Sequence, residues 1–409
     1  MSTFLSQISV TCRSCSDFVV PAKKQKCDDL CNSPGSSHSN FIDSPTSDAK
    51  PRRFKSLKHA MLLSYCGDAF FGMQVQGETP TVELSLLKAM ANEGLISEDD
   101  IKKPGNSFHF QRAARTDKGV SAVRQVCSMM LRIDQSQTTK ILEGLNYRLP
   151  DTIRVFGLQR VTKSFDAKRE CSGRTYSYTL PSYAFAKADE ETTERFRLSK
   201  HRSDEINRVL AKFCGTHNFF NFTSNREHSD KSCMRYIIEF VCGEPELRNG
   251  VEFVTLFIRG QSFMLNQIRK MVALAIAVVR GVTGEATIEL AWNSDRLDLP
   301  KAPGLGLLLE TVHYDWYNEK FGSLHGDLKW TVSEEEVLAF RNTRIMSFIV
   351  ETESRQRPML EWLASLSLHS YDQNRTQGRH VPFLRTLVQR RFARWGVRVE
   401  DIVVKNLSG

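Results

Sequence analysis

The sequence predicts an α+β fold built from two similar halves, and three observations lead to this expectation. Stretches with the two-residue alternation of β-strands and stretches with the apolar spacing of α-helices follow one another from residue 59 to residue 281. Their order is strand, helix and strands, and then helix, strands and helix, which is typical of an α+β protein. A polar crossover at about residues 185–200 separates the two series.

The first half begins with an expected strand at residues 59–65, followed by a glycine-punctuated loop at 65–76. A helix is expected over residues 81–94, because its apolar residues recur at i, i+4 and i+8 and Gly94 suits its C-terminal end. The further elements expected in this half are a short helix at 137–150 and strands at 123–133, 151–161 and 173–181.

The second half begins after the crossover with a helix at residues 203–215. Ser203 or Asp204 is its expected N-cap, and Gly215 its expected stop. The remaining elements expected here are strands at 235–242 and 251–260 and a long helix at 262–281.

The charge of the chain indicates an anionic partner, of which nucleic acid is the commonest. The formal net charge is +9, and residues 376–409 hold seven Lys/Arg against two Asp/Glu. Within this basic tail, residues 381–399 have the spacing of an amphipathic helix whose arginines face RNA phosphates. A solvated terminal helix and a membrane-surface helix are the alternatives. No run approaches the ~20 apolar residues that a membrane-spanning helix needs.

The cysteines and the N-terminal segment predict an intracellular protein that is not secreted. Ten cysteines are scattered along the chain without a secretory signal, so reduced thiols are expected. The composition of residues 1–54 predicts a disordered leader, with a transit peptide as the alternative. The basic cluster at 50–58 is either a nuclear signal or a run of solvated charges. Four leader cysteines have a spacing that can hold zinc, but their irregular surroundings favour free thiols, so no metal is expected. They are Cys12, Cys15, Cys27 and Cys31.

Two charged residues require an explanation. In QRAARTDKGVSA (111–122), Asp117 lies between Arg115 and Lys118, which fits either a solvated turn or a carboxylate whose charge its neighbours control. Arg269 falls within an apolar stripe of the expected helix at 262–281. It must therefore either pair with a carboxylate or extend along its aliphatic stem to the surface.

The aromatic residues also allow two interpretations. Alternation places Tyr176 and Tyr178 on one face of their strand, as core residues or as a platform on which a base stacks. The segment GTHNFFNFTS (215–224) is an aromatic lid or ordinary packing, and His217 is expected to orient its loop by a hydrogen bond rather than to bind a metal. No Walker loop, GxGxxG, HExxH or GxSxG motif occurs, so any chemistry is expected to run without a nucleotide cofactor.

Six blocks of sequence, taken together, resemble the TruA-type family of tRNA pseudouridine synthases. RAARTDKGVSA closely resembles the catalytic motif of that family, and the wording of the later blocks is nearest to its eukaryotic branch, which acts at multiple tRNA sites in nucleus and mitochondrion. The similarity runs from about residue 57 to about residue 318 in matching order. The other blocks are YCGDAFFGMQVQ, GRTYSYTL, GTHNFFNFTS, GQSFMLNQIRKM and PKAPGLGLLLETVHYDWYN.

The resemblance implies a fold of two pseudo-symmetric halves that form one extended antiparallel sheet, with a basic active-site cleft between them. It implies that Asp117 is the catalytic aspartate and Arg115 its motif arginine. Tyr176 would stack on the target uracil, and Arg269 would be the basic partner of the aspartate. Asn266 departs from the histidine expected in this branch. No cofactor or metal is implied, and the expected partner is tRNA, with mRNA or small nuclear RNA left open.

The chain divides on this basis into five expected parts. They are a leader at 1–54, the first half of a catalytic domain at 55–182, its second half at 183–318, a helical extension at 319–375 and a basic tail at 376–409. The expected activity is isomerisation of uridine to pseudouridine, in which an ionised aspartate either attacks covalently or removes the C2′ proton. A catalytically silent RNA-binding protein and a glycosidase are the competing interpretations. The glycosidase is disfavoured because that chemistry usually needs two carboxylates.

Overall fold

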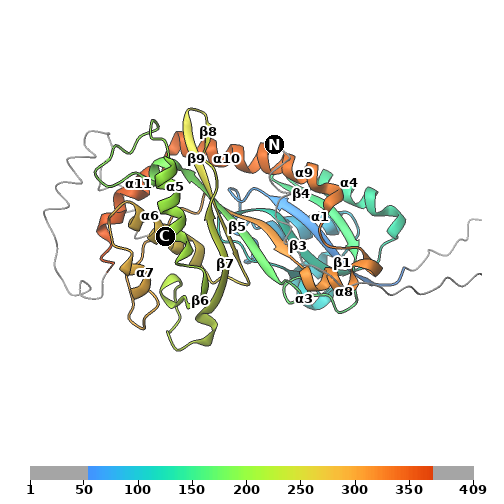
Figure 1. Ribbon diagram of the computed structural model, residues 1–409. Helices are drawn as coiled ribbons and strands as arrows, with labels where there is room; N and C mark the ends of the chain where they lie inside the picture. Colours follow the sequence, from blue (N-terminus) through green and yellow to red (C-terminus); the bar gives the residue numbers. More distant parts are fainter. Residues whose placement is uncertain (1–53, 372–409) are drawn as a thin grey trace, which may run out of the picture. The chain divides into compact units, whose positions relative to one another are not determined.

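The computed structural model describes residues 54–371 of the chain. The zinc spacing of the leader and the basic tail at 376–409 lie outside the described residues. The described part is built on a ten-stranded sheet flanked by helices (Figure 1), which confirms the predicted α+β class.

The strands agree closely with the segments that the sequence predicts. They are β1 (Leu57–Tyr65), β2 (Gln111–Arg112), β3 (Ser121–Leu131), β4 (Ile153–Arg160), β5 (Gly173–Pro181), β6 (Gly215–Asn218), β7 (Met234–Cys242), β8 (Glu246–Arg248), β9 (Val251–Gly260) and β10 (Leu307–His313). All of the strands predicted from periodicity are present, and β1 and β3 are buried on both faces along nearly their whole length.

The helices include the four that periodicity predicts and several in the predicted extension. They are α1 (Val82–Asn92), α2 (Glu98–Lys102), α3 (Pro104–Ser107), α4 (Thr138–Arg148), α5 (Lys200–Ala211), α6 (Gln267–Val279), α7 (Ala286–Leu290), α8 (Asp315–His325), α9 (Glu334–Phe340), α10 (Ser347–Gln356) and α11 (Pro358–Ser365). A π-helical segment, Arg341–Met346, joins α9 to α10 without a break.

The two halves repeat one order of elements. β1, α1, β3, α4 and β4 of the first half correspond to β5, α5, β9, α6 and β10 of the second. Within the sheet, β4-β1-β3 and β10-β5-β9 follow in the same relative order. This repeat assigns β5 to the second half, whereas the boundary expected at residue 182 assigns it to the first.

The prediction of a wholly antiparallel sheet is wrong at one place. Strands β3 and β10 run parallel, and they are the neighbours at which the two halves join. The other paired strands are antiparallel. When the two repeated units lie side by side, the edge strand β10 of the second unit meets the edge strand β3 of the first, and these two strands have the same direction.

Two predicted helix boundaries are also wrong. Helix α5 begins one turn earlier than predicted, because the side chain of Ser199 accepts a hydrogen bond from the backbone of Arg202; its first turn is charged and shows no apolar periodicity. Helix α6 begins only at Gln267, because Asn266 has a left-handed backbone with φ of 63°. Leu265, expected in the apolar stripe, is therefore 56% exposed in the preceding loop.

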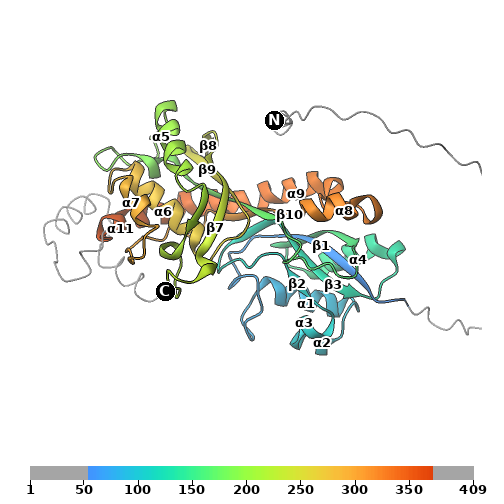
Figure 2. The same cartoon turned by 60° about the horizontal axis from the view of Figure 1, so that its bottom comes forward.

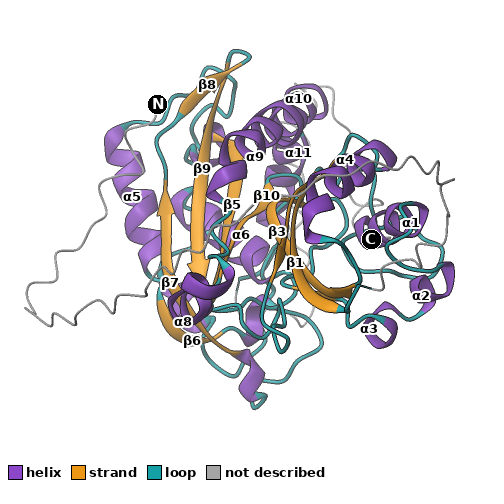
Figure 3. Cartoon of the chain, turned by 90° about the vertical axis from the view of Figure 1, so that its right-hand side faces the viewer, coloured by secondary structure: helices purple, strands orange, loops and turns teal. Residues whose placement is uncertain are grey.

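The C-terminal extension lies across the sheet. Figure 1 shows α9 and α10 as one orange rod that passes from the first-half strands to the second-half strands, and Figure 2 shows α1 and α9 on opposite sides of the first-half strands. Figure 3 shows α5 beside the outer strands of the second half and α4 beside those of the first. Among residues 54–371, no helix is long and apolar enough to cross a membrane.

Candidate active site

A cavity of about 780 Å³ contains all four residues that the sequence singles out: Asp117, Arg115, Tyr176 and Arg269. Its walls come from segments far apart in the chain. The loop before α1 and the loop before β3 form the first-half side, and β5 with the segment entering α6 forms the second-half side. Among residues 54–371, six of the residues that line it are lysine or arginine, and Asp117 is the one acidic residue.

The loop that carries Asp117 is held by backbone hydrogen bonds from the neighbouring loop. The amide of Met73 donates to the carbonyl of Thr116 at 3.1 Å, and the amide of Gly119 donates to Phe70 at 3.2 Å. Gly72 has a φ of +103°, and a Cβ there would lie 2.8 Å from the Thr116 carbonyl oxygen. Only glycine allows this close approach, which explains the glycine that punctuates the first loop.

The opposite side of the same loop is tied to the sheet. Gln125, a buried residue of β3, forms two hydrogen bonds with the backbone of Ala114, at 3.2 and 2.8 Å. Arg174 of β5 donates to the carbonyl of Ala113 at 2.6 Å, which connects the first-half loop to the second-half strand. Hydrogen bonds on both sides therefore hold the loop that carries Asp117 in place before any substrate binds.

The carboxylate of Asp117 experiences opposing influences. Burial raises its pKa, and the positive charges of Arg269 and Lys301 act against this rise. Within residues 54–371, no side chain or amide donates a hydrogen bond to this carboxylate, so its oxygens are available to a bound molecule. A half-buried carboxylate with free oxygens and nearby cations fits a reactive group better than a solvated turn.

Arg269 is anchored by the backbone rather than by a carboxylate. Its Nε donates to the carbonyl of Ala302 at 2.7 Å, and the amide of Ala302 donates to the Arg269 carbonyl at 3.2 Å. Burial lowers the pKa of the guanidinium, whereas Tyr178 and Asp117 raise it. The described part of the chain contains no direct ion pair between Arg269 and Asp117, so the two charges interact across the cavity, not in contact.

Tyr176 lies on the cavity wall with 7% of its surface exposed. The ring of Phe263 packs edge-on against it, with centroids 5.2 Å apart and an interplanar angle of 81°. Burial raises the pKa of its hydroxyl to about 12, so the hydroxyl remains protonated at neutral pH. Tyr178, two residues along the same strand face, donates to the carbonyl of Pro303 at 2.6 Å and supports the segment around Arg269.

The mouth of the cavity carries exposed cations. Arg115 donates to the side chain of Gln74 at 3.3 Å, and the ammonium group of Lys118 lies 4.4 Å from the centre of the Phe71 ring. Asn266, where a histidine was expected, lines the cavity in its left-handed conformation. Cations and aromatic rings at one opening are typical of a site for single-stranded nucleic acid.

Sequence reasoning missed Lys301, Phe263 and Arg174 as parts of this site. Burial and Arg269 lower the pKa of Lys301, whereas Asp117 raises it, which places the lysine within electrostatic reach of both groups. All three residues occur inside the blocks that resemble the family. The sequence could have indicated them, because each is a basic or aromatic residue inside one of the blocks that resemble the family.

The segment 215–224 is packing rather than a lid. Phe219 and Phe222 pack against Trp292 at centroid distances of 5.0 and 5.2 Å, and both phenylalanines are buried. The ring of His217 stacks on Trp292 and hydrogen-bonds the carbonyl of Cys214 at 2.9 Å, as the loop-orienting prediction requires. Within the described ranges, no cluster of three metal-ligating side chains occurs.

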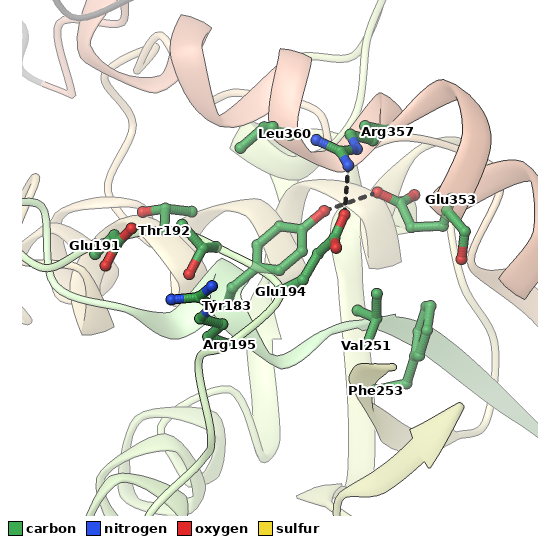
Figure 4. A pocket seen from close by; sticks show the side chains of 12 residues that line it. Tyr183, Glu191, Thr192, Glu194, Arg195, Val251, Phe253, Glu353, Arg357 and Leu360 are labelled. Carbon is green, nitrogen blue, oxygen red and sulfur yellow. Dashed lines mark hydrogen bonds and ion pairs between the residues drawn. The ribbon is translucent and has the colours of Figure 1, made fainter. Parts of the chain in front are cut away.

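A second cavity, of about 440 Å³, lies where α10 meets α11 (Figure 4). Three glutamates line it, and the hydroxyl of Tyr183 donates to the carboxylate of Glu353 at 3.3 Å. Arg357 pairs with Glu194 at its edge. This mixed lining lacks the positive excess of the first cavity and does not suit an RNA backbone.

Glu353 makes the stability of the protein depend on pH. Burial raises its pKa from 4.5 to about 7, although the amide of Met359 and the hydroxyl of Tyr183 donate to it. The folded state therefore retains a proton that the unfolded state releases, and stability falls as pH rises from about 4.5 through 7. We expect Glu353→Gln to raise the free energy of unfolding at pH 8 by roughly 3 kcal/mol, with little gain near pH 4.5.

Thermal or urea unfolding across this pH range measures the effect. Glu351→Gln is the matched control, because Glu351 is an exposed partner of Arg355 on the same helix and its loss should leave the pH profile unchanged. A Glu353→Gln profile parallel to that of the unaltered protein would contradict the buried-proton explanation.

Comparisons with known proteins show which family the sequence matches. The family model described as tRNA pseudouridine synthase matches residues 209–315. The chain is 43% identical to Pseudouridylate synthase 1 homolog of Mus musculus over 330 residues, covering 78% of this chain and 76% of that protein. It is also 43% identical to the Homo sapiens protein of the same name over 320 residues, covering 76% and 73%. It is 30% identical to tRNA pseudouridine synthase 1 of Saccharomyces cerevisiae, covering 67% and 64%.

Proposed function

The chain belongs to the tRNA pseudouridine synthase family, and from this premise we propose that it isomerises uridines of tRNA to pseudouridine with Asp117 as its catalytic carboxylate. The observation that carries this proposal is the chemistry of the large cavity. A carboxylate with free oxygens lies among six cationic side chains and beside a buried tyrosine. The cations suit an RNA backbone, and the tyrosine suits a base that has left its stack.

The reaction breaks the bond between C1′ and N1, rotates the uracil and forms a bond from C1′ to C5, after which the proton on C5 is lost. Asp117 acts as an ionised group in either route. It attacks C1′ covalently, or it removes the proton from C2′ to give a glycal. The detached uracil carries negative charge, so the cations opposite Asp117 stabilise it while the cavity limits water.

The basic residues divide between chemistry and binding. Arg269 lines the cavity while its Nε is bound to the backbone, and Lys301 adds a second charge near Asp117. We assign these two to the reacting nucleotide. Arg115 and Lys118 lie at the mouth, where they contact the flanking phosphates. The tail at 376–409 is a candidate for further phosphate contacts.

Tyr176 provides a test of base stacking. Tyr176→Phe keeps the ring and loses the hydroxyl, whereas Tyr176→Ala loses both. Because stacking on an aromatic ring is worth about 1–3 kcal/mol per base, the Ala variant should bind a 5-fluorouridine RNA roughly five- to a hundredfold more weakly, and the Phe variant nearly as well as the unaltered protein. Equal binding by the two variants would show that Tyr176 only packs the core.

The proposal is tested by incubating the full chain with unmodified tRNA transcripts and mapping pseudouridine at single-nucleotide resolution. We expect product at specific uridines without added metal or cofactor. Including messenger and small nuclear RNA transcripts in the same assay tests whether the substrate range extends beyond tRNA, and imaging the tagged chain tests the proposed nuclear or mitochondrial location. Failure to convert any tRNA uridine, while tRNA binding persists, would instead support a silent RNA-binding protein.

A further inference from the structure

The two halves of the sheet are joined by a short seam. Strands β3 and β10 share two registered residue pairs, Leu308 with Ser121 and Leu309 with Ala122. By comparison, β1 and β3 pair along nearly their whole length. A parallel contact of this length offers few hydrogen bonds to resist movement of one half relative to the other.

The proposed catalytic residues lie on both sides of this seam. Asp117 precedes β3 in the first half, whereas Tyr176 on β5 and Arg269 on α6 belong to the second. Any change in the angle or spacing at the seam therefore changes the distance between the carboxylate and the groups that hold the base. The reaction needs a fixed geometry here, since a misplacement of about 1 Å can cost on the order of a hundredfold in rate.

The helical rod from Glu334 to Gln356 passes across the sheet from the first-half strands to the second-half strands (Figure 1). Its α9 end is bound to the first half: Arg124 of β3 donates to the carboxylate of Glu334 at 2.6 Å, and the rings of Phe340 and Phe156 pack edge-on at 6.0 Å. Its α10 end is bound to the second half through the buried Glu353 and Tyr183, the contact that Figure 4 shows.

The middle of the rod forms an ion pair with β10, one of the two strands of the seam. Glu310 on β10 is 7% exposed and accepts hydrogen bonds from Arg341 at 2.8 and 3.2 Å. The same carboxylate accepts a hydrogen bond from Ser177 of β5 at 2.7 Å. Ser177 follows Tyr176 directly and points to the opposite face of the strand. The hydrogen bonds of Glu310 therefore hold the strand segment that carries the proposed stacking tyrosine.

Arg341 begins the π-helical segment of the rod. A π-helical turn changes the direction in which successive side chains leave a helix, and such turns are frequent at functional sites. The isoleucine and methionine of the segment, Ile345 and Met346, are buried, while Arg341 reaches Glu310. The irregular turn thus serves both the packing of the rod and its ionic contact.

We propose that the C-terminal rod is a clamp that holds the two halves of the active site in register, with Arg341, Glu310 and Ser177 as positioning residues for the isomerisation. The inference rests on the proposed function. It goes beyond that function in giving the extension a role in the rate of the chemical step rather than in RNA binding. The clamp residues lie on the face away from the cavity and do not line it.

The test uses the full chain with Glu310→Gln and Arg341→Gln together, because both positions then become neutral and no buried charge is left unpaired. We expect the single-turnover rate constant on saturating enzyme to fall about ten- to a hundredfold, with the dissociation constant for tRNA unchanged within about twofold. Ser177→Ala, which loses one hydrogen bond, should show a smaller fall. Arg341→Lys, which keeps a positively charged donor for Glu310, should retain most of the rate of the unaltered protein.

The control is Arg344→Gln with Asp151→Asn, which removes a solvent-exposed ion pair made by the same π-helical segment. It should change neither constant. A double variant that melts at a lower temperature but keeps the full rate constant well below its melting point would overturn the clamp, since the network would then be only structural. Equal losses in affinity and rate would also overturn it. No product from the unaltered chain would overturn the proposed function and the clamp with it.

Discussion

Replacing Asp117 with asparagine is expected to abolish pseudouridine formation. Asparagine keeps nearly the same shape but can neither attack C1′ nor accept the C2′ proton, so the single-turnover rate should fall by roughly 10⁴-fold or more, as for other residues that carry a covalent or proton-transfer step. Binding of tRNA should change little, because the cavity lining has six cations that remain. Measuring both constants with purified protein and unmodified tRNA separates the two effects.

The same variant should be at least as stable as the unaltered protein at neutral pH. Burial raises the pKa of Asp117, so ionising this group costs the folded state more than the unfolded state as pH rises past its ordinary value. Asp68→Asn is the matched control, because Asp68 is an exposed carboxylate in the neighbouring loop that does not line the cavity. Turnover by the Asp117→Asn enzyme above the level of a mock preparation would rule out Asp117 as the catalytic group.

The strands could be predicted from the sequence because short runs rich in apolar residues and bounded by turn residues favour an extended backbone. Residues 173–181 form β5 with the predicted bounds, although both of its faces are buried rather than one. The parallel seam could not be predicted in this way, because periodicity reports which face of a strand is buried and not the direction of its neighbour. The start of α6 was missed for a local reason: Asn266 adopts a left-handed conformation that few residues tolerate, and the apolar run at 263–265 before it looked like the first turn of the helix.

The sequence predicted four residues of the candidate site, but not its other members or its contacts. The resemblance of the blocks brought Asp117, Arg115, Tyr176 and Arg269 together, and the same cavity contains them all. It did not indicate that Arg269 is held by the carbonyl of Ala302, because a backbone contact between distant segments leaves no side-chain pattern in the sequence. The clamp was missed for a related reason, since Glu310 and Arg341 are single charges in otherwise unremarkable stretches.

Arg269→Leu is expected to cause the second-largest loss of activity. Two effects combine. First, the uracil fragment loses a cation that stabilises its negative charge. We expect this loss to lower the single-turnover rate about a hundredfold, which is the effect of removing one donor from an oxyanion hole. In addition, Asp117 loses Arg269, the cation that lowers its pKa more than Lys301 does, so the pKa of Asp117 rises further. Because the reaction needs the ionised carboxylate, the acid limb of the pH–rate profile should move to higher pH.

The shift of the profile distinguishes this explanation from simple loss of packing. Arg202→Leu is the control, since Arg202 is an arginine of α5 with little exposure, paired with Glu190 and not part of the cavity. That variant should lose stability without moving the acid limb. Arg269→Lys should restore the position of the limb, because it returns a positive charge, but only part of the rate, because a lysine has no second nitrogen to bind Ala302 while facing the substrate. A full rate for Arg269→Leu at neutral pH, with an unmoved acid limb, would show that Asp117 does not depend on this arginine.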